Sequence, residues 1–418
     1  MLLKRAVITG LGAITPIGNT IPEYWGNLIN GKSGAAIIAR IDAAVFKTRF
    51  ACEVKNFDPL NFFERKDVKR FDRYAQFAMI AADEAIADSG LDAESVDKEL
   101  IGVLWASGIG GLEIFQEEVS QFARSADGVP RFNPFFIPKM IADIAAGQIS
   151  MKHGFKGPNF APVAACASST ISIAQAFDLI RLGKATAVVA GGSEAAITAG
   201  GIGGFNSMKA MSERNDSPET ASRPYDKDRD GFVMGEGGGA LIIEELEHAL
   251  ARGAKIYAEV LGSGLSADAY HLTAPHPDGL GAAKVMEYAL KDSSIKATDI
   301  NYINTHGTST PLGDNAELLA IKKVFGGHAY NMNISATKSM TGHLLGGAGA
   351  IEAIACVLSI VHDIVPPTIN HFTDDPEIDS KLNLTFNTAQ KRVVNAALSN
   401  TFGFGGHNAA AVFSKFAK

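Results

Sequence analysis

The chain has 418 residues, of which 46% are hydrophobic and 20% charged, a balance typical of a well-buried globular protein with two or three domains. Its net charge of −7 argues against general nucleic-acid binding, although a local basic patch remains compatible with it. Three widely spaced cysteines without a CxxC pair argue against a disulfide framework and against a thiolate metal site.

The uncharged stretch 159–177, NFAPVAACASSTISIAQAF, is long enough to span a membrane, and we expect no better candidate elsewhere in the chain. Asn159, Pro162, Gln175 and four hydroxyl side chains would nevertheless put too much polarity into hydrocarbon. The first ten residues lack the apolar core and cleavage site of a signal peptide. We therefore expect a soluble, cytoplasmic protein that does not enter a membrane.

Apolar, β-branched segments that end in glycine alternate along the chain with helix-like segments. Strands are expected at 5–12, 101–108, 186–193, 238–246, 256–264, 300–307 and 395–406, and an amphipathic helix at 77–90. This alternation predicts an α/β protein with a parallel or mixed sheet covered on both faces. The glycine turns after the strands at 5–12 and 256–264 suggest an internal repeat, with the helix 245–255 as the seam.

Cys166 is expected at an elbow, between a short strand that ends at 162–165 and a helix that begins at 167. A helix N-terminus favours thiolate over thiol, and its free N–H groups can bind a developing oxyanion. A buried, inert thiol in a helix of small residues is the alternative interpretation. The polar loop 215–232 is either a solvated surface loop or an ordered insertion beside a site.

Two histidines lie in glycine-rich segments, His306 in NTHGTSTPLGD and His343 in ATKSMTGHLLGGAGA. In each segment the histidine is expected directly after a strand, where α/β folds place catalytic groups. Lys338 adds a positive charge five positions before His343. Metal binding by the two histidines is the rival interpretation, but no HxH or HExxH pattern supplies a third ligand. The roles of His271 and His407 stay open.

Four segments, VAACASS, NTHGTSTPLGD, TKSMTGHLLGGAGAIE and SNTFGFGGHN, resemble in this order the active-site segments of the β-ketoacyl-acyl carrier protein synthases. RPYDKDRDGFVMGEGGG and VITGLGAITPIGN are also similar to that family, so the resemblance covers essentially the whole chain. ASGIGGL (106–112) and GFGGHN are most similar to the type II, elongating branch. Ala165 stands where many relatives carry threonine, a minor departure.

The resemblance implies the thiolase-like fold, in which two similar α/β halves, here 1–253 and 254–418, form five layers in an αβαβα arrangement and assemble as a homodimer. It implies decarboxylative Claisen condensation of a cysteine-bound acyl chain with malonyl-carrier protein, as in fatty-acid elongation, without a cofactor of the enzyme's own. The phosphopantetheine belongs to the carrier protein. Such an enzyme is an acyltransferase.

The resemblance also assigns roles to single residues. Cys166 is implied to be the nucleophile, His306 and His343 to stabilise the enolate oxygen as neutral N–H donors, and Lys338 to orient and polarise this network. Phe404 is implied to be a gate, whose backbone N–H forms the oxyanion hole together with that of Cys166. Contacts with the acyl chain or the pantetheine are implied for Ile109, Phe205, Thr308 and Thr310. Glu352 is implied to support Lys338. The resemblance also implies a structural cation near Asn304 and Glu352, which catalysis does not require.

The basic residues Arg65, Lys66, Lys69, Arg70 and Arg73 stand out in an acidic chain. They are either a solvated helix face or, with Lys209, a docking patch for the acidic acyl carrier protein. Among rival enzymes, a thiolase would carry a second cysteine where this chain has GFGGHN, and an initiating ketosynthase would pair one histidine with asparagine. A non-catalytic chain-length partner would lack Cys166. A specialised polyketide-like pathway stays open, because the same residues would serve it.

Overall fold

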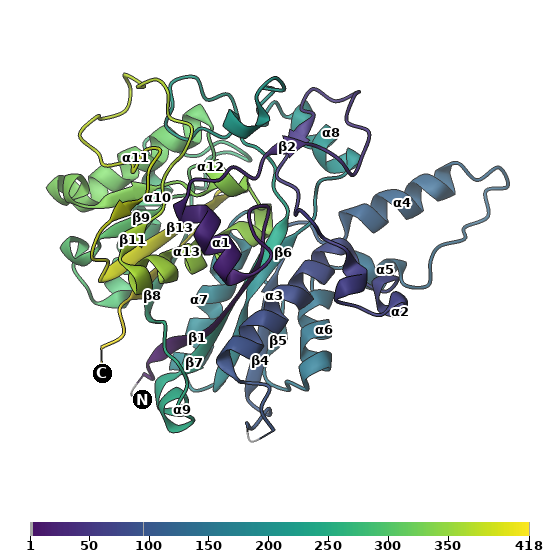
Figure 1. Cartoon of the computed structure of the whole chain (residues 1–418), viewed down its shortest axis with the longest axis horizontal. Coiled ribbons are helices and arrows are strands. Elements are labelled where there is room, and N and C mark those ends of the chain that lie inside the picture. Colours follow the sequence, from purple (N-terminus) through teal and green to yellow (C-terminus); the bar gives the residue numbers. More distant parts are fainter. Residues whose placement is uncertain (1–2, 95, 418) are drawn as a thin grey trace.

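The computed structural model describes residues 3–94 and 96–417. The chain builds a mixed sheet with helices on both faces (Figure 1). The elements of the first half are, in chain order, β1 (Ala6–Ile14), α3 (Arg73–Ser89), β4 (Ile101–Ala106), α6 (Ile144–His153), β5 (Asn159–Phe160), α7 (Ser168–Arg181), β6 (Ala187–Glu194) and β7 (Gly237–Glu245). The predicted helix at 77–90 is the greater part of α3, and Gly90 caps it in the left-handed conformation with φ 70°.

The second half repeats this order. Its elements are β8 (Ala258–Ala267), α10 (Leu280–Ser293), β9 (Tyr302–Asn304), α11 (Pro311–Phe325), β10 (Asn333–Ser335), α13 (Ala348–His362), β13 (Ala396–Gly403) and β14 (His407–Ser414). The strand order is β5-β4-β6-β7-β1 in the first half and, running outward in the opposite direction, β8-β14-β13-β9-β10 in the second. Each pair of neighbouring strands in the first half has a counterpart of the same orientation in the second half. In both halves the two outer pairs are parallel and the two inner pairs antiparallel, so the halves have the same topology.

The two half-sheets join where β1 pairs with β8 over three residues, so the strands form one continuous ten-stranded sheet. Helices α7 and α13 pack against each other and contact strands of both halves, whereas α3 and α6 cover the first half and α10 and α11 the second. The layered α/β, thiolase-like fold expected from the sequence is confirmed, with this short ladder as an addition. The predicted boundary at 253/254 falls between α9 (Leu246–Ala251) and β8.

The most apolar helix of the fold corrects one expectation about the sequence. Leu345–His362 is long and apolar enough to cross a membrane, and so is a better candidate than 159–177, but 89% of it is buried inside the fold. Every residue of α13 from Ala348 to Ile360 is buried. A helix that is apolar all round is the expected consequence of a place between two sheet layers.

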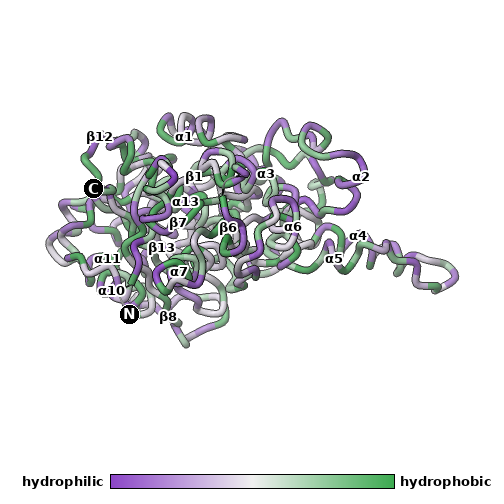
Figure 2. The backbone as a smooth tube through the Cα atoms, turned by 90° about the horizontal axis from the view of Figure 1, so that it is seen from below, coloured by the Kyte–Doolittle hydropathy of each residue, from purple (hydrophilic) through white to green (hydrophobic). Residues whose placement is uncertain are grey.

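Shorter elements connect the frame. They are α1 (Ile21–Ile29), β2 (Ala36–Ile37), β3 (Phe50–Ala51), α2 (Arg65–Val68), α4 (Leu112–Ala123), α5 (Phe136–Met140), α8 (Ala199–Ser207), α12 (Lys338–Thr341), β11 (Ile364–Val365) and β12 (Gln390–Lys391). Helix α4 and the loop after it form an arm that projects from the body of the molecule (Figures 1 and 2).

Candidate active site

Cys166 lies at a sharp turn in front of the central helix α7. The helix begins at Ser168 with Ala167 as its N-cap residue, and Ala165 has a φ of 48°, in the left-handed region. The strand expected at 162–165 does not form, because β5 ends at Phe160 and only an isolated bridge joins Ala164 to Cys166. The predicted elbow is therefore present, although a loop and not a strand leads into it.

The two expected histidines lie beside the cysteine. His343 Nε2 is 3.1 Å from Cys166 Sγ, and the rings of His306 and His343 meet edge to face with their centroids 5.2 Å apart. All three side chains line one cavity of about 500 Å³. Residues 177 positions apart thus contact each other at the sulfur.

The two histidines reach the cavity by different routes. His306 comes two residues after β9, as expected. His343 does not follow its strand directly, because helix α12 (Lys338–Thr341) lies between β10 and His343. Gly342 ends α12 with a φ of 66°, and a Cβ there would lie 2.8 Å from Cys52 Sγ, so this turn requires glycine.

Burial and Lys338 together keep both imidazoles neutral. Burial, reinforced by the positive charge of Lys338, lowers the pKa of His306 and of His343 well below the ordinary value. Neutral rings agree with the expected role as N–H donors. Lys338 itself is buried, does not line the cavity, and donates to Glu352, whose pKa burial raises to about 7.

The thiol of Cys166 differs from the expectation. Burial raises its pKa to about 12, and the charge of Lys338 and the hydrogen bonds from the backbone N–H groups of Cys166 and Phe404 only partly offset this. A helix N-terminus contributes about 0.3–1 kcal/mol, less than full desolvation of a thiolate costs. Cys166 is therefore held as the neutral thiol, so an attack by its sulfur would require a base to take the proton.

The same two N–H groups lie near Sγ and lower the pKa of the thiol, so they are the candidates for the anion-binding corner expected there. Phe404 lies in the turn between β13 and β14, and Gly405 beside it has a φ of 90°. A Cβ at Gly403 would lie 2.8 Å from Ala164 O, so glycine lets this hairpin approach the cysteine elbow. The ring of Phe404 faces Phe205, with centroids 6.3 Å apart.

The expected substrate-contacting residues all line the cavity: Ile109, Phe205, Thr308 and Thr310. The hydroxyls of Thr308 and Thr310 are 3.0 Å apart. Ile109, in the loop after β4, is 41% exposed, so its side chain is available to a bound chain.

Sequence reasoning missed Glu317 of α11. Its carboxylate accepts the backbone N–H groups of His306 and Gly307, each at 2.9 Å, and burial raises its pKa to about 7. Asp314, one turn earlier on the same helix, is also fully buried. Two carboxylates at i and i+3 in the first two turns of the helix that begins at the end of NTHGTSTP were the available signal.

Two buried polar oxygens on the α13 side of the sheet have no hydrogen-bond partner, Glu352 Oε2 and Ser399 Oγ. Ser399 pairs in register with Asn304 in the parallel ladder of β13 and β9. Unpartnered buried oxygens are costly and suit a hard cation. Within the described residues no cluster of three His, Cys, Asp or Glu side chains forms a metal site.

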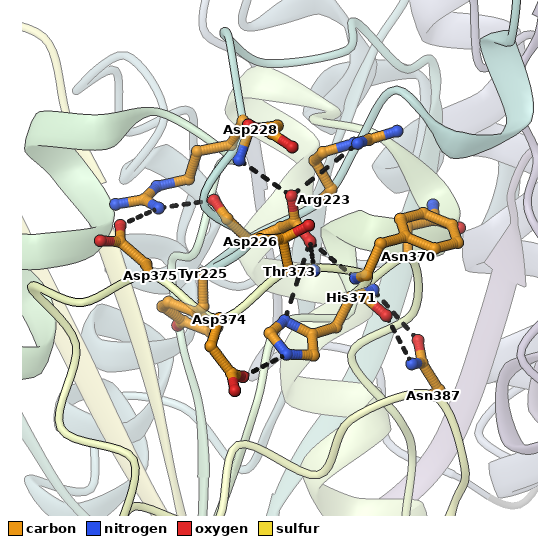
Figure 3. A network of polar contacts seen from close by, with 12 residues as sticks. Arg223, Tyr225, Asp226, Asp228, Asn370, His371, Thr373, Asp374, Asp375 and Asn387 are labelled. Carbon is orange, nitrogen blue, oxygen red and sulfur yellow. Dashed lines mark hydrogen bonds and ion pairs between the residues drawn. The ribbon is translucent and has the colours of Figure 1, made fainter.

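The loop 215–232 is an ordered insertion linked to the site (Figure 3). Asp226 accepts the backbone N–H groups of Phe372 and Thr373 at 2.7 and 2.8 Å, and Arg229 pairs with Asp375 at 2.6 Å and with Asp314 at 3.3 Å. Tyr225 donates to Thr305, next to His306, at 2.6 Å. The second of the two sequence interpretations therefore holds.

The basic cluster divides into two groups. Arg65, Lys66, Lys69, Arg70 and Lys209 are exposed, and Lys209 also lines the cavity. Arg73 is not part of this surface: its guanidinium pairs with the fully buried Glu236 at 2.8 Å and lies over the ring of Phe57. His271 and His407 are exposed and do not line the cavity.

The chain matches known proteins along its whole length. Residues 4–249 match the β-ketoacyl synthase N-terminal domain and residues 257–372 the C-terminal domain. It is 52% identical to 3-oxoacyl-[acyl-carrier-protein] synthase 2 of Synechocystis over 99% of this chain and 98% of that protein, and 49% identical to the Staphylococcus aureus protein of the same name over 99% of both.

Solved structures agree with these matches. A ketosynthase of a type II polyketide synthase, solved in complex with its acyl-carrier protein, superposes with a TM-score of 0.91 at 34% identity and covers 99% of this chain and 100% of its own. Together with the geometry of the cysteine and the two histidines, these matches show that the chain belongs to the β-ketoacyl synthase family.

Proposed function

We propose that this chain is a 3-oxoacyl-[acyl-carrier-protein] synthase that extends fatty acyl chains. It joins a cysteine-bound acyl group to the two carbons that malonyl-carrier protein provides after loss of CO₂. The observation that carries the proposal is the contact of Cys166 Sγ with His343 Nε2 at 3.1 Å, with His306 beside it in the same cavity. Full-length relatives at about half identity bear the name of this activity.

In the first half-reaction Cys166 attacks the thioester carbonyl of the acyl-carrier protein. The oxygen becomes negative and takes hydrogen bonds from the backbone N–H groups of Cys166 and Phe404. His343 Nε2 accepts the thiol proton and returns it to the departing pantetheine sulfur, which is needed because burial keeps the resting cysteine protonated. The product is an acyl-thioester on Cys166.

In the second half-reaction malonyl-carrier protein enters, and its thioester oxygen lies between His306 and His343. Cleavage of the bond to the carboxylate releases CO₂ and places the electron pair in an enolate, which an N–H of neutral His306 and, in its Nε2–H tautomer, of neutral His343 stabilises. The enolate carbon attacks the acyl-cysteine, the carbon–sulfur bond breaks, and the leaving thiolate takes up one proton from solvent, which the overall reaction consumes. Lys338 acts at a distance by keeping both rings neutral. The reaction consumes no cofactor of the chain's own.

The partner is an acyl carrier protein, which we infer to dock on the exposed basic residues Arg65, Lys66, Lys69, Arg70 and Lys209. Lys209 lies at the rim of the cavity, where the pantetheine arm must enter. A ketosynthase of similar fold has been solved in complex with its acyl-carrier protein, which supports a partner of this kind. Positive charge at the rim would speed encounter with an acidic carrier.

A homodimer is supported by the apolar surface of the projecting arm. Phe115, Phe122, Phe132 and Ile137 are each between 38% and 55% exposed there, and edge strand β5 carries the exposed Phe160. A patch of this kind on a soluble protein marks an interaction surface. A cytoplasmic location agrees with the substrates. A cation held by the free oxygens of Glu352 and Ser399 would stabilise this carboxylate without entering the reaction.

The activity is tested by incubating the purified protein with acyl-carrier protein and malonyl-carrier protein and measuring product mass. The proposal requires a 3-oxoacyl product two carbons longer and one equivalent of CO₂. Release of CO₂ without an extended product would contradict it. Acyl groups of graded length in the same assay also separate fatty-acid elongation from a pathway that accepts only specialised starters.

A further inference from the structure

Glu194, the last residue of β6, is a buried carboxylate beside the reacting sulfur that the mechanism above does not use. Its two oxygens accept four hydrogen bonds from neutral donors. Oε1 accepts from Ser107 Oγ at 2.8 Å and from the N–H of Ile109 at 3.3 Å, and Oε2 accepts from the N–H groups of Gly108 and Gly346 at 2.8 and 3.0 Å.

These donors come from two loops with different tasks. Ser107, Gly108 and Ile109 belong to the loop after β4 that carries the apolar wall of the cavity. Gly346 comes three residues after His343. The loops touch directly, because a Cβ on Gly346 would lie 2.1 Å from the nitrogen of Gly108, and one on Gly108 would lie 3.3 Å from the carbonyl oxygen of Ala165.

A single carboxylate thus ties the wall residue Ile109, the turn after His343 and the cysteine elbow into one unit. A carboxylate suits this role because both its oxygens accept only, so each can take two donors without conflict. We propose that Glu194 is a positioning residue that fixes Ile109 relative to Cys166 and His343 and thereby sets which acyl chain lengths the cavity admits. The proposal rests on the proposed function, since it names the specificity of that same site.

Glu194→Gln tests this role, because it replaces one carboxylate oxygen by an NH₂ group and keeps the shape of the side chain. An NH₂ group in place of either oxygen would face two N–H or O–H donors, so at least one loop must move. With Ile109 no longer fixed, longer chains fit more readily. We compare kcat/KM for a carrier protein that bears a long acyl chain with kcat/KM for one that bears a short chain. We expect the long-to-short ratio to rise on the order of tenfold, the scale of discrimination in an apolar pocket.

Glu84→Gln is the matched control. Glu84 of α3 is also a largely buried carboxylate, accepts two backbone N–H groups, from Ala13 and Ile21, each at 2.8 Å, and does not line the cavity. It should lower the melting temperature without changing the chain-length ratio. Ser107→Ala removes a single donor to Glu194 and should change the chain-length ratio in the same direction. It takes the place of Glu194→Gln as the test variant if Glu194→Gln does not fold.

An equal loss at every chain length, an unchanged ratio in both variants, or the same change in Glu84→Gln would overturn the proposal. The wild-type assay is measured first and separates the two claims. If the wild-type chain makes no 3-oxoacyl product, the proposed function fails. If it makes the product and the ratio does not respond to Glu194→Gln or Ser107→Ala, only the positioning role fails.

Discussion

The two halves of the chain use the same frame for different chemistry. In each, the connection from the outermost strand to the central helix carries a reactive group, Cys166 between β5 and α7 and His343 between β10 and α13. The connection after the adjacent strand also corresponds, with Ile109 after β4 and His306 after β9. In the proposed function the first half therefore supplies the nucleophile and a wall for the acyl chain, and the second half supplies both imidazoles.

The halves differ most in their last connection. Residues 195–236 join β6 to β7 and include α8 and Lys209, whereas a three-residue turn with Phe404 joins β13 to β14. Because the topology is repeated, equivalent connections of the two halves meet at one cavity. The differences between these connections give the two halves different roles. Changes in the first half should therefore disturb acyl transfer, and changes at the histidines should disturb decarboxylation.

The largest effect is expected at the second-half histidines. His306→Ala or His343→Ala should slow decarboxylation of malonyl-carrier protein by roughly 10² or more, because each removes one hydrogen bond to the enolate oxygen. His306→Ala should still become acylated, since His343 remains at the sulfur. Measured CO₂ release and acyl-enzyme mass report the two effects. His328→Ala, whose ring bonds the carbonyl of Ile300 in the same half, is the control. Normal decarboxylation in both variants would contradict the assignment.

Phe404 crosses the division, because it belongs to the second half but, in the proposed mechanism, its N–H group stabilises the oxyanion formed during acylation. Phe404→Ala should slow acylation of Cys166 about tenfold by loosening this turn, with a modest loss of stability. Rapid-quench mass measurement of the acyl-enzyme checks the rate. Phe413→Ala, at a fully buried ring, gives the reference loss for a core site. A loss of about 3–5 kcal/mol for Phe404→Ala would instead mark it as an ordinary core residue.

A smaller effect is expected at the basic residues of the first half. Lys69→Glu with Arg70→Glu should raise KM for carrier-protein substrates roughly fivefold and flatten its salt dependence, since rim charges act on encounter. Activity with small pantetheine thioesters should hardly change. The same reversal at Lys381 and Lys391, exposed on the other half, should have no such effect. Equal losses with both kinds of substrate would mean that α2 was destabilised.

The smallest effect is a displacement along the pH axis. The charge of Lys338 lowers the pKa of His306 and of His343, so removal of this charge raises both pKa values. When the pH is lowered, both histidines then become protonated, and lose their neutral donor form, at a higher pH than in the wild-type protein. Lys338→Met combined with Glu352→Gln, which avoids a buried unpaired carboxylate, should move the acid limb of decarboxylation to higher pH. Glu352→Gln alone keeps the lysine and should leave the limb in place. An acid limb that does not move in the double variant would refute this role.

Much of the frame follows from local patterns. The strand segments and the Gly90 stop depend on neighbouring residues, so they can be predicted from the sequence, and the structure confirms them. The glycine turns expected after 5–12 and 256–264 are wrong, because β1 and β8 continue through these glycines to Ile14 and Ala267. Cys166, His306 and His343 each lie in a distinctive segment, and the structure brings all three to one cavity.

What the sequence could not give depends on distant partners. The sequence around Arg73 resembles that around the exposed basic residues beside it. Only the ion pair with Glu236, 163 positions away in the chain, gives Arg73 its structural role. The thiol pKa of Cys166 depends on burial that arises only in the fold. Helix α12 is four residues long, too short for a periodic pattern to reveal it. Glu194 carries no local signal, because three of its four partners are backbone groups.

The division of labour between the halves is tested most directly by CO₂ release from malonyl-carrier protein in Cys166→Ala. Decarboxylation needs donors for the enolate oxygen but no acyl-enzyme. The variant should therefore lose chain extension and labelling by thiol-directed reagents, yet still release CO₂ at a rate equal to or above that of the wild-type protein. If Cys166→Ala releases no CO₂ while the histidine variants still do, the nucleophile and the enolate donors have been assigned to the wrong halves.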